Sequence, residues 1–391
     1  MKTIDDANFC GKRVIVRVDF NVPMENGVVT DDTRIQRAIP TIKKLVQDGA
    51  KIILMSHLGR PSGKGFEQEF SLQPVAIKLS EIIGQPVVFS NQTTGDDAIE
   101  KISALSNGEI IVLENLRFDP REKKNDETFA SELASLADVY VNDAFGTAHR
   151  AHASTAGIAS FLPSYAGYLM CKEVDTIEGM LSNPKKPFVA VLGGSKVSDK
   201  IKVIENLIDK ADSIIIGGAM CFTFLKAQGA SVGSSLVEED WVEKCKLMIN
   251  KAKENNCVLM LPVDVVCANK IDEGAETKIC NAFNIDSDLM GLDIGPATIE
   301  NYQKAINNAN SVFWNGPMGV FEIDKFALGT KAIAEALANN NDADTIIGGG
   351  DSVAAVNKFG LSDKMTFIST GGGASMELVQ GDKLPGVEAL K

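Results

Sequence analysis

The sequence predicts an α/β protein made of two Rossmann-like, three-layer α/β/α domains with parallel sheets. Short apolar segments alternate with longer amphipathic segments along the chain, which is the pattern of strands and helices in such folds. A chain of 391 residues also exceeds what one hydrophobic core usually supports. The strands of the first half are followed by arginines and those of the second half by glycines, so we expect the two domains to bind different ligands.

The composition is that of an ordinary globular protein, with 45% apolar and 23% charged residues. The net charge of −13 argues against nucleic acids and anionic membranes as partners. An acidic protein can still bind an anion where its few cations converge. The chain starts without an apolar targeting segment, and no run of about eighteen apolar residues follows. We therefore expect a soluble, cytoplasmic protein.

The seven cysteines include no CxxC pair, and only three histidines are present. This argues against a zinc cluster. Reduced and mostly buried thiols are expected instead. The cysteines are Cys10, Cys171, Cys221, Cys245, Cys257, Cys267 and Cys280.

The first segment of note is 14–23, where apolar residues alternate with Arg17, Asp19 and Asn21. Alternation alone predicts a half-exposed strand with a solvated polar face, ended by Pro23. Capping residues at 30–33 then open an amphipathic helix that stops at Gly49. Arg34 lies in the first turn of this helix, against the helix dipole, which points to a functional role.

Three later strands of the first half each lead to an arginine. The strand at 51–56 leads to Arg60, the strand at 110–113 to Arg117, and the strand at 139–141 to Arg150. Ligands of open α/β sheets bind at the carboxyl ends of the strands. One such arginine is most often a solvated loop residue, but three at equivalent positions predict a pocket for a phosphate or carboxylate.

The segment 164–181 reads as one helix, stopped by Asn183-Pro184, that connects the two halves. After it, the apolar strand 188–192 breaks at Gly193-Gly194, and a segment with helical spacing follows. A new helix presents unpaired N–H groups to an anion. If the helix has begun by Lys196, this residue and Lys200 share one face.

Further strands of the second half also end in glycines or polar residues. Two triple glycines open helices, which suits a polyphosphate held by backbone N–H groups. Asp351, inside one of these turns, is placed to hold Mg²⁺ beside phosphate oxygens. The strand ends are Gly217-Gly218, Asn315-Gly-Pro-Met-Gly-Val-Phe-Glu322, Gly348-Gly-Gly-Asp-Ser352 and Gly371-Gly-Gly373.

Two common nucleotide-binding motifs are absent. Neither G-x-x-x-x-G-K-[ST] nor G-x-G-x-x-G occurs, and there is no G-x-S-x-G nucleophile elbow. A nicotinamide-dependent oxidoreductase therefore remains an alternative with little support. A non-catalytic nucleotide-binding protein on the same fold is a second alternative. Such a protein would be expected to lose Arg34, Lys196, Lys200 or Asp351, and all four are present.

Strings of residues across nearly the whole chain resemble the signatures of the phosphoglycerate kinase family, in the family's order. Ser352 stands where threonine is more usual and keeps the hydroxyl, and Cys171 stands where the connector often carries a charge. The strings are Arg17-Val-Asp-Phe-Asn-Val-Pro23, Ser56-His-Leu-Gly-Arg-Pro61, Glu114-Asn-Leu-Arg-Phe118, Asp143-Ala-Phe-Gly-Thr-Ala-His-Arg150, Gly193-Gly-Ser-Lys-Val-Ser-Asp-Lys200, Trp314-Asn-Gly-Pro-Met-Gly-Val-Phe-Glu322, Gly348-Gly-Gly-Asp-Ser352 and Thr370-Gly-Gly-Gly373.

The resemblance implies reversible phosphoryl transfer between ATP and the carboxylate of 3-phosphoglycerate, giving ADP and 1,3-bisphosphoglycerate, with Mg²⁺ as cofactor and a monomeric protein. It implies a 3-phosphoglycerate-binding domain at 1–163, a connector helix at 164–182 and a nucleotide-binding domain at 183–374, with the tail 375–391 packing back on the first domain. A cleft closed by hinge bending is expected to bring the ligands together.

The resemblance also implies roles for individual residues. Arg60, Arg117 and Arg150 would hold the phosphate that is not transferred, and Arg34 would be the catalytic arginine. The substrate contacts would be Asp19, Phe20, Asn21, Arg34, His57, Leu58, Gly59, Arg60, Arg117 and Arg150. The nucleotide contacts would be Gly194, Lys196, Lys200, Gly217, Gly218, Asn315, Pro317, Glu322, Gly349, Gly350, Asp351 and Ser352, with Asp351 on the metal. The catalytic set would be Arg34, Lys196, Lys200, Gly372 and Gly373.

Such a reaction explains why no histidine–carboxylate dyad is evident. A carboxylic acid with a pKa of about 4 is already ionised at neutral pH, so its attack on phosphorus needs no general base. The protein has to supply alignment and positive charge instead.

Overall fold

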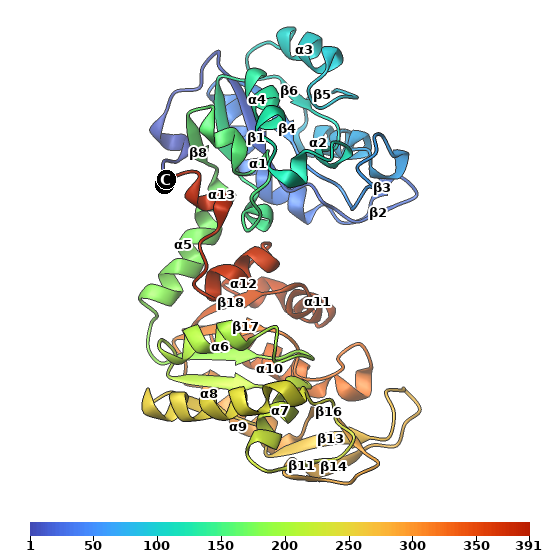
Figure 1. The fold of residues 1–391 in the computed structure, drawn as a ribbon, viewed down its shortest axis with the longest axis vertical. Coiled ribbons are helices and arrows are strands. Elements are labelled where there is room, and N and C mark those ends of the chain that lie inside the picture. Colours follow the sequence, from blue (N-terminus) through green and yellow to red (C-terminus); the bar gives the residue numbers. More distant parts are fainter. The chain divides into compact units, whose positions relative to one another are not determined.

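The computed structural model describes all 391 residues, and the chain divides into two compact units. The first unit comprises Met1–Asp175 and Lys383–Lys391, and the second comprises Thr176–Asp382. Each unit is built around a six-stranded sheet in which all strands run parallel (Figure 1). The predicted α/β fold with two parallel sheets is confirmed.

The first unit holds one large sheet, a small hairpin and the surrounding helices. The sheet strands are β1 (Arg13–Arg17), β4 (Lys51–Met55), β5 (Val87–Phe89), β6 (Ile110–Val112), β7 (Val139–Asn142) and β8 (Ser164–Ala166), and the hairpin is β2 (Met24–Glu25) with β3 (Val28–Val29). The helices are α1 (Thr33–Gln47), α2 (Gln73–Ile83), α3 (Asp96–Ser103), α4 (Glu127–Ser135), the first part of α5 (Tyr168–Ser182) and α13 (Pro385–Glu388). The strand order β5–β6–β4–β1–β7–β8 puts β4 and β1 in the middle.

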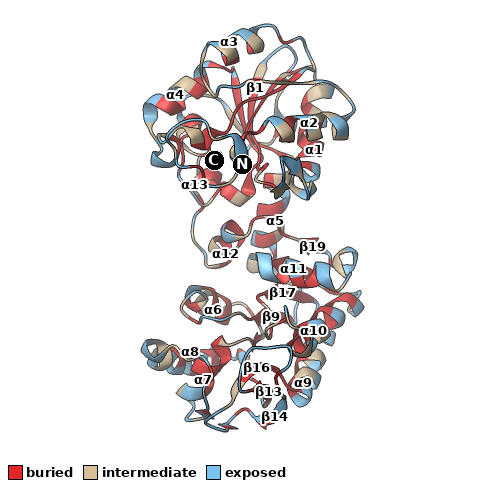
Figure 2. Ribbon diagram, turned by 90° about the vertical axis from the view of Figure 1, so that its right-hand side faces the viewer, coloured by how far each residue is buried: buried red, intermediate tan, exposed pale blue.

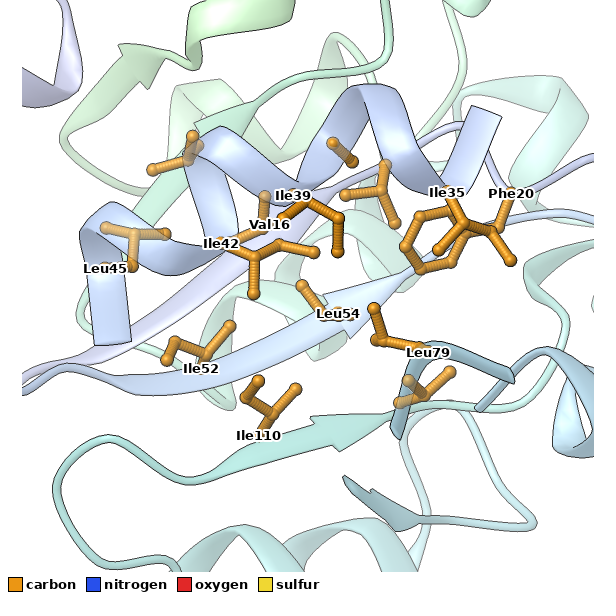
Figure 3. Packing of buried hydrophobic residues seen from close by; sticks show 14 of the residues in the cluster. Val16, Phe20, Ile35, Ile39, Ile42, Leu45, Ile52, Leu54, Leu79 and Ile110 are labelled. Atoms are coloured by element: carbon orange, nitrogen blue, oxygen red, sulfur yellow. The ribbon is translucent and has the colours of Figure 1, made fainter. Parts of the chain in front are cut away.

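Helix α1 packs along one face of this sheet, with α2 beside it (Figure 3). The apolar residues of α1 recur at helical spacing and point at the strands, where Val16 and Leu54 are fully buried. Ile15 and Ile53 alternate with them, point to the opposite face and are fully buried too. The sheet is therefore covered on both faces, while the helices keep an exposed outer side (Figure 2). The α1 residues in this core are Ile35, Ala38, Ile39, Ile42 and Leu45.

The predicted half-exposed strand at 14–23 is wrong in two respects. Strand β1 ends at Arg17, and it lies between β4 and β7. A central strand of a covered parallel sheet is buried on both faces, and Arg17 is only 1% exposed. Residues 18–23 continue as irregular backbone that carries Asp19 and Asn21 past the end of the strand.

The second unit repeats this architecture. Its large sheet has the order β12–β10–β9–β17–β18–β19, formed by β9 (Phe188–Leu192), β10 (Ser213–Ile216), β12 (Val258–Met260), β17 (Ser311–Asn315), β18 (Asp344–Gly348) and β19 (Phe367–Ile368). Its helices are α6 (Ile201–Ile208), α7 (Met220–Ala227), α8 (Val242–Glu254), α9 (Pro296–Asn307), α10 (Leu328–Asn339), α11 (Gly350–Lys358) and α12 (Gly373–Val379). Trp314, fully buried on β17, packs in the core shared with α9, α10 and α11.

The second unit also contains an antiparallel sheet that the sequence analysis did not predict. Strand β13 (Asp264–Ala268) lies between β14 (Lys278–Asn281) and β16 (Met290–Ile294), with a bulge between Val266 and Cys267. A short parallel pair joins β11 (Ser231–Val232) to β15 (Asn284–Ile285). Strands β14, β11 and β15 are short and partly polar, so they lack the apolar runs that marked the parallel strands. Strand β13 does contain an apolar run, Val265–Ala268, which was not recognised as a strand.

Two predicted helix starts need correction. Residues 164–166 form the edge strand β8, and α5 begins only at Tyr168. Lys196 precedes α6, because Lys200 is the N-cap and the first helical residue is Ile201. Lys196 and Lys200 therefore do not share a helix face. No helix of the chain has the length and apolar character needed to cross a membrane.

Candidate functional site

The first group of predicted residues gathers at the carboxyl edge of the first sheet. Strands β6, β4, β1 and β7 are neighbours in this sheet and run parallel, so the segments that follow them meet at one edge. Arg117 lies in the short helix η3 (Leu116–Phe118) after β6, and Arg150 follows the short helix η5 (Phe145–Thr147) after β7. Arg60 lies in the exposed loop after β4.

The three arginines differ in their surroundings. Arg117 is 6% exposed, and its Nη1 donates to the Gly59 carbonyl at 2.7 Å. Burial, followed by the positive charges of Arg150 and Arg17, lowers the pKa of Arg117 to about 10. Arg150 is exposed, and its Nε donates to Nε2 of His149 at 3.1 Å. Arg117 and Arg150 thus form one region of positive charge that is suited to an anion.

The loop after β1 contributes side chains and backbone in different ways. The Asp19 carboxylate accepts a hydrogen bond from Nη1 of Arg34, which brings the α1 arginine to this edge. Oδ1 of Asn21 accepts from the Gly59 N–H at 2.8 Å and ties this loop to the one after β4. The side chains of Phe20 and Leu58 are buried in the core, so only their backbone could face a ligand.

His57 lies within this positive region. It is 4% exposed, and its Nδ1 lies 3.1 Å from Nη2 of Arg17. Burial holds the pKa of His57 well below its usual value, and the charges of Arg17, Arg117, Arg34 and Arg150 lower it further. The imidazole is therefore neutral at physiological pH.

Arg17 is the functional candidate that the sequence analysis missed at this edge. It was assigned to a solvated strand face, although it carries a charge in a strand that the sheet buries. An arginine next to four apolar positions of a predicted parallel strand was the available signal, because a buried charge requires specific partners.

The second group surrounds a cavity of about 310 Å³ at the carboxyl edge of the second sheet. It brings together the lysines after β9, the end of β17 and the two glycine turns that open α11 and α12. The predicted residues among its lining are Gly194, Lys196, Lys200, Asn315, Gly349, Gly350, Asp351, Ser352, Gly372 and Gly373.

Hydrogen bonds fix the walls of this cavity. Nζ of Lys200 donates to Oδ1 of Asn315, whose Nδ2 donates to the Gly348 carbonyl at 2.6 Å. Oγ of Ser352 accepts from the Gly316 N–H at 2.6 Å. Burial lowers the pKa of Lys200, against the opposing charges of Asp199 and Asp351. The serine hydroxyl thus holds a backbone turn of the cavity wall.

Gly349 shows why glycine is required in one of these turns. Its φ is +89°, in the left-handed region, and a Cβ there would lie 2.3 Å from Nδ2 of Asn315. Gly349, Gly350 and Asp351 line the cavity at the start of α11, and the first N–H groups of a helix have no partner within it, so they can bind phosphate oxygens.

A second cavity of about 340 Å³ shares Gly194, Ser195 and Asp351 with the first. Its lining is largely apolar, with Phe222 and Met318 among the larger side chains, and it includes the predicted residues Gly218, Pro317 and Glu322. Gly217 does not line it, because a Cβ at this position would lie 2.3 Å from Sδ of Met318 in the packed interior. An apolar slot beside a polar, glycine-lined cavity fits a nucleotide with its base and its phosphates.

The metal candidate Asp351 lies in the first turn of α11 and lines both cavities. No cluster of three or more histidine, cysteine, aspartate or glutamate side chains in the chain could hold a metal ion. A single carboxylate beside phosphate-binding groups nevertheless fits Mg²⁺, which usually takes one or two carboxylates together with substrate phosphates and water.

A nucleotide-sized pair of cavities on one parallel sheet and an arginine-rich edge on another define a nucleotide-dependent phosphotransferase. The comparisons with known proteins specify this class. The family model "Phosphoglycerate kinase" matches residues 4–382. The chain belongs to the phosphoglycerate kinase family.

Individual relatives agree over their full lengths. The chain is 55% identical over 391 residues to a phosphoglycerate kinase of Thermosipho africanus, covering 99% of this chain and 97% of the relative. It is 54% identical over 394 residues to the phosphoglycerate kinase of Nostoc punctiforme, covering 100% of this chain and 98% of the relative. The structure of phosphoglycerate kinase from Coxiella burnetii matches with a TM-score of 0.92 at 45% identity, covering 99% and 98%. The crystal structure of phosphoglycerate kinase from Pyrococcus horikoshii matches with a TM-score of 0.85 at 34% identity, covering 100% of this chain and 98% of that one.

Proposed function

We propose that the protein catalyses reversible phosphoryl transfer between ATP and the carboxylate of 3-phosphoglycerate, giving ADP and 1,3-bisphosphoglycerate. The full-length family match supports this reaction and leaves the oxidoreductase alternative without support. The observation that carries the proposal is the pairing of two anion sites of different character. One is a region of positive charge around Arg117 and Arg150, and the other is a glycine-lined cavity next to an apolar one.

The first unit is proposed to bind 3-phosphoglycerate. Arg60, Arg117 and Arg150 would hold the phosphate that is not transferred, because guanidinium groups bind phosphate bidentately. Asp19, Asn21 and His57 would contact the hydroxyl and carboxylate of the glycerate. Arg34 would stabilise the charge on the transferring group. The positive region around His57 and Arg117 supports this assignment.

The second unit is proposed to bind the nucleotide. Gly218 and Pro317 would form the adenine slot, with Gly217 next to Gly218 in the chain but outside the cavity lining, and Glu322 would contact the ribose. Lys196, Lys200, Asn315 and Ser352 would contact the phosphates together with the N–H groups of the glycine turns. Asp351 would hold Mg²⁺, which neutralises phosphate charge when it is bound. The shared lining of the two cavities supports this arrangement.

Transfer itself is proposed to need alignment and charge stabilisation but no general base. The attacking carboxylate is ionised at neutral pH, so the reacting oxygen carries no proton to remove. We also propose that hinge bending brings the reacting atoms of the two ligands to within about 3–3.5 Å of each other. A cytoplasmic, monomeric protein remains part of the proposal, and the seven free thiols are compatible with a reducing compartment.

The test is an assay of the purified protein with ATP, 3-phosphoglycerate and Mg²⁺. The acyl phosphate product is trapped with hydroxylamine, which distinguishes it from phosphate released by simple ATP hydrolysis. We expect hydroxamate only when both substrates are present. Absence of hydroxamate at any Mg²⁺ concentration, or its formation without 3-phosphoglycerate, would refute the proposed reaction.

A further inference from the structure

Arg17, the last residue of β1, is a buried charge. Its side chain is 1% exposed in the middle of the first sheet. A guanidinium in such a place needs an acceptor for its N–H groups and a nearby negative charge. The partners of Arg17 are Ser154, His57 and the backbone of Val18, with Glu122 as a nearby charge.

Arg17 makes three hydrogen bonds. Its Nη1 donates to the Val18 carbonyl, its Nε donates to Oγ of Ser154 at 2.9 Å, and its Nη2 lies 3.1 Å from Nδ1 of His57. Arginine has only donors and stays protonated in proteins. Nδ1 of His57 must therefore be the acceptor in the third contact and carries no proton.

The negative charge comes mainly from Glu122, in the short helix η4 (Glu122–Lys124), and in smaller part from Asp19. The side chain of Glu122 is fully buried. Its Oε1 accepts from Oγ of Ser154 at 2.6 Å and its Oε2 accepts from the Ser154 N–H at 3.0 Å. Because the serine Oγ already accepts from Arg17, its proton points to the carboxylate. Both carboxylate oxygens thus accept hydrogen bonds. Burial raises the pKa of Glu122, whereas the charge of Arg17 and the hydrogen bonds from Ser154 lower it and favour the ionised carboxylate.

One further ionisable group faces this carboxylate. Nδ1 of His152 lies 3.8 Å from Oε1 of Glu122. Burial lowers the pKa of His152 to about 4, and the charges of Arg17, Arg117 and Arg150 contribute to this. His152 is therefore neutral at physiological pH and does not compete with Arg17 for the charge of Glu122.

The consequence for His57 follows from its hydrogen bonds. The ring is neutral and Nδ1 is unprotonated, so its one proton is on Nε2. Nε2 has no hydrogen-bond partner in the protein, and it is not completely buried. The Nε2–H group is thus available as a donor to a ligand in the arginine-rich region.

We propose that Glu122 and Ser154 are positioning residues for His57. They fix the Arg17 guanidinium, which in turn holds the imidazole as the Nε2–H tautomer and aims this donor at 3-phosphoglycerate. The aim at this substrate rests on the proposed function, whereas the tautomer and its dependence on Glu122 do not.

The first experiment reads the tautomer directly. Long-range ¹H–¹⁵N correlation spectra of the full-length protein at pH 7, without ligand, should show His57 with a protonated Nε2 and an unprotonated Nδ1. The assignment comes from the missing signals of His57→Gln. A His57 with a protonated Nδ1, or with both nitrogens protonated, would overturn the proposal whether or not the protein is a kinase.

The second experiment tests the dependence on Glu122 and Ser154. Glu122→Gln and Ser154→Ala should each change the His57 ¹⁵N signals. Each should also raise the KM for 3-phosphoglycerate by about 10-fold, the size expected when one well-aligned hydrogen bond to the substrate is lost. The KM for ATP should stay within about twofold of the wild-type value. Ser154→Ala keeps the test available if Glu122→Gln does not fold.

Glu114→Gln is the matched control. Glu114 is also buried in the same unit and accepts hydrogen bonds from Oγ of Ser71 and the N–H groups of Leu72 and Asn115, but none from Arg17 or Ser154. Its substitution should lower the melting temperature without changing the His57 signals. If Glu122→Gln and Ser154→Ala also lower only the melting temperature and leave the His57 signals and the KM for 3-phosphoglycerate unchanged, their role is purely structural and the proposal is refuted.

Discussion

The Asp19 carboxylate accepts a hydrogen bond from the Arg34 guanidinium. The two residues come from different elements, because Asp19 follows β1 and Arg34 lies in the first turn of α1. A cation at this end of a helix opposes the helix dipole, so the carboxylate compensates an arrangement that is unfavourable within the helix. The pair keeps a partly exposed arginine at the sheet edge, where the transferring group is proposed to react.

The first prediction compares Arg34→Ala with Arg150→Ala. If Arg34 stabilises charge that develops only in the transition state, its loss should lower kcat by about 10³-fold, with a much smaller rise in KM. Arg150→Ala should mainly raise the KM for 3-phosphoglycerate, because it is proposed to hold the phosphate that is not transferred. Steady-state kinetics over both substrates measures this. The same pattern of kcat and KM in the two variants would contradict the separate roles.

The second prediction concerns Gly59, which joins two parts of the proposed substrate site. Its φ is +61°, and a Cβ would lie 2.4 Å from the Phe70 ring. Gly59→Ala should cost about 2–4 kcal/mol of stability through backbone strain and overpacking. It should also raise the KM for 3-phosphoglycerate, because its N–H and carbonyl bind Asn21 and Arg117.

Gly11→Ala is the control for Gly59→Ala. Gly11 has a φ of +72°, but no other group lies within 4 Å of the position that a Cβ would take. Only the backbone strain of about 1 kcal/mol should remain, and the kinetic constants should not change. Thermal unfolding and steady-state kinetics of the two variants separate the effects. Equal losses of stability would show that the Phe70 contact is not what demands glycine.

The third prediction tests the metal assignment. EDTA should abolish turnover, and excess Mg²⁺ should restore it. Asp351→Asn should raise the Mg²⁺ concentration needed for half-maximal rate by about 10-fold or more, because one carboxylate ligand is lost. Asp324→Asn, which removes an exposed carboxylate paired with Lys358 in the same unit, should leave this concentration unchanged. An unaltered Mg²⁺ dependence in Asp351→Asn would refute the role of Asp351.

Much of the fold, and many residues of the two proposed anion sites, could be predicted from the sequence because their signals are local. An apolar strand followed by Arg117 or by Gly193-Gly194 can be recognised within about ten residues, and parallel strands bring such ends to one edge. The arginine of α1 could be singled out as well, since Arg34 is unfavourable where it stands.

The remainder depends on contacts between distant segments. Ser154 supports Arg17 across 137 positions of the chain, and nothing near either residue indicates the other. Strand β8 was read as helix because its three residues are too few to show a period. The exposure of Arg17 was misjudged for a similar reason, as only the neighbours β4 and β7 show that β1 is central.

The last prediction uses two buried carboxyl groups, Asp143 and Asp293. Burial raises the pKa of each to about 7. The Thr41 side chain and backbone N–H groups lower that of Asp143 in part, and backbone N–H groups lower that of Asp293. An unfolded aspartate has a pKa of about 3.9. Between about pH 4 and pH 7 the folded state therefore binds more protons than the unfolded state. Each group then makes the protein less stable as the pH rises through this window, by up to about 1.4 kcal/mol per pH unit.

Asparagine should have different effects at the two positions. Oδ1 of Asp143 accepts from the N–H groups of Leu169 and Met170, whereas its Oδ2 has no partner. Asp143→Asn keeps both bonds and removes the titration. Relative to the wild type, the variant should gain about 2–3 kcal/mol of stability between about pH 5 and pH 7.5.

Both oxygens of Asp293 are used, since Oδ1 accepts from the Ile294 N–H at 2.9 Å and Oδ2 from the Gly329 N–H at 2.7 Å. An asparagine can accept only one of these bonds and turns its amide N–H toward the other donor. Asp293→Asn should thus cost about 1–3 kcal/mol already at about pH 5, where Asp143→Asn should be close to neutral. Urea unfolding of both variants and the wild type at the two ends of this pH range measures these differences. If the difference in unfolding free energy between Asp143→Asn and the wild type is the same at both ends of the range, Asp143 does not titrate there.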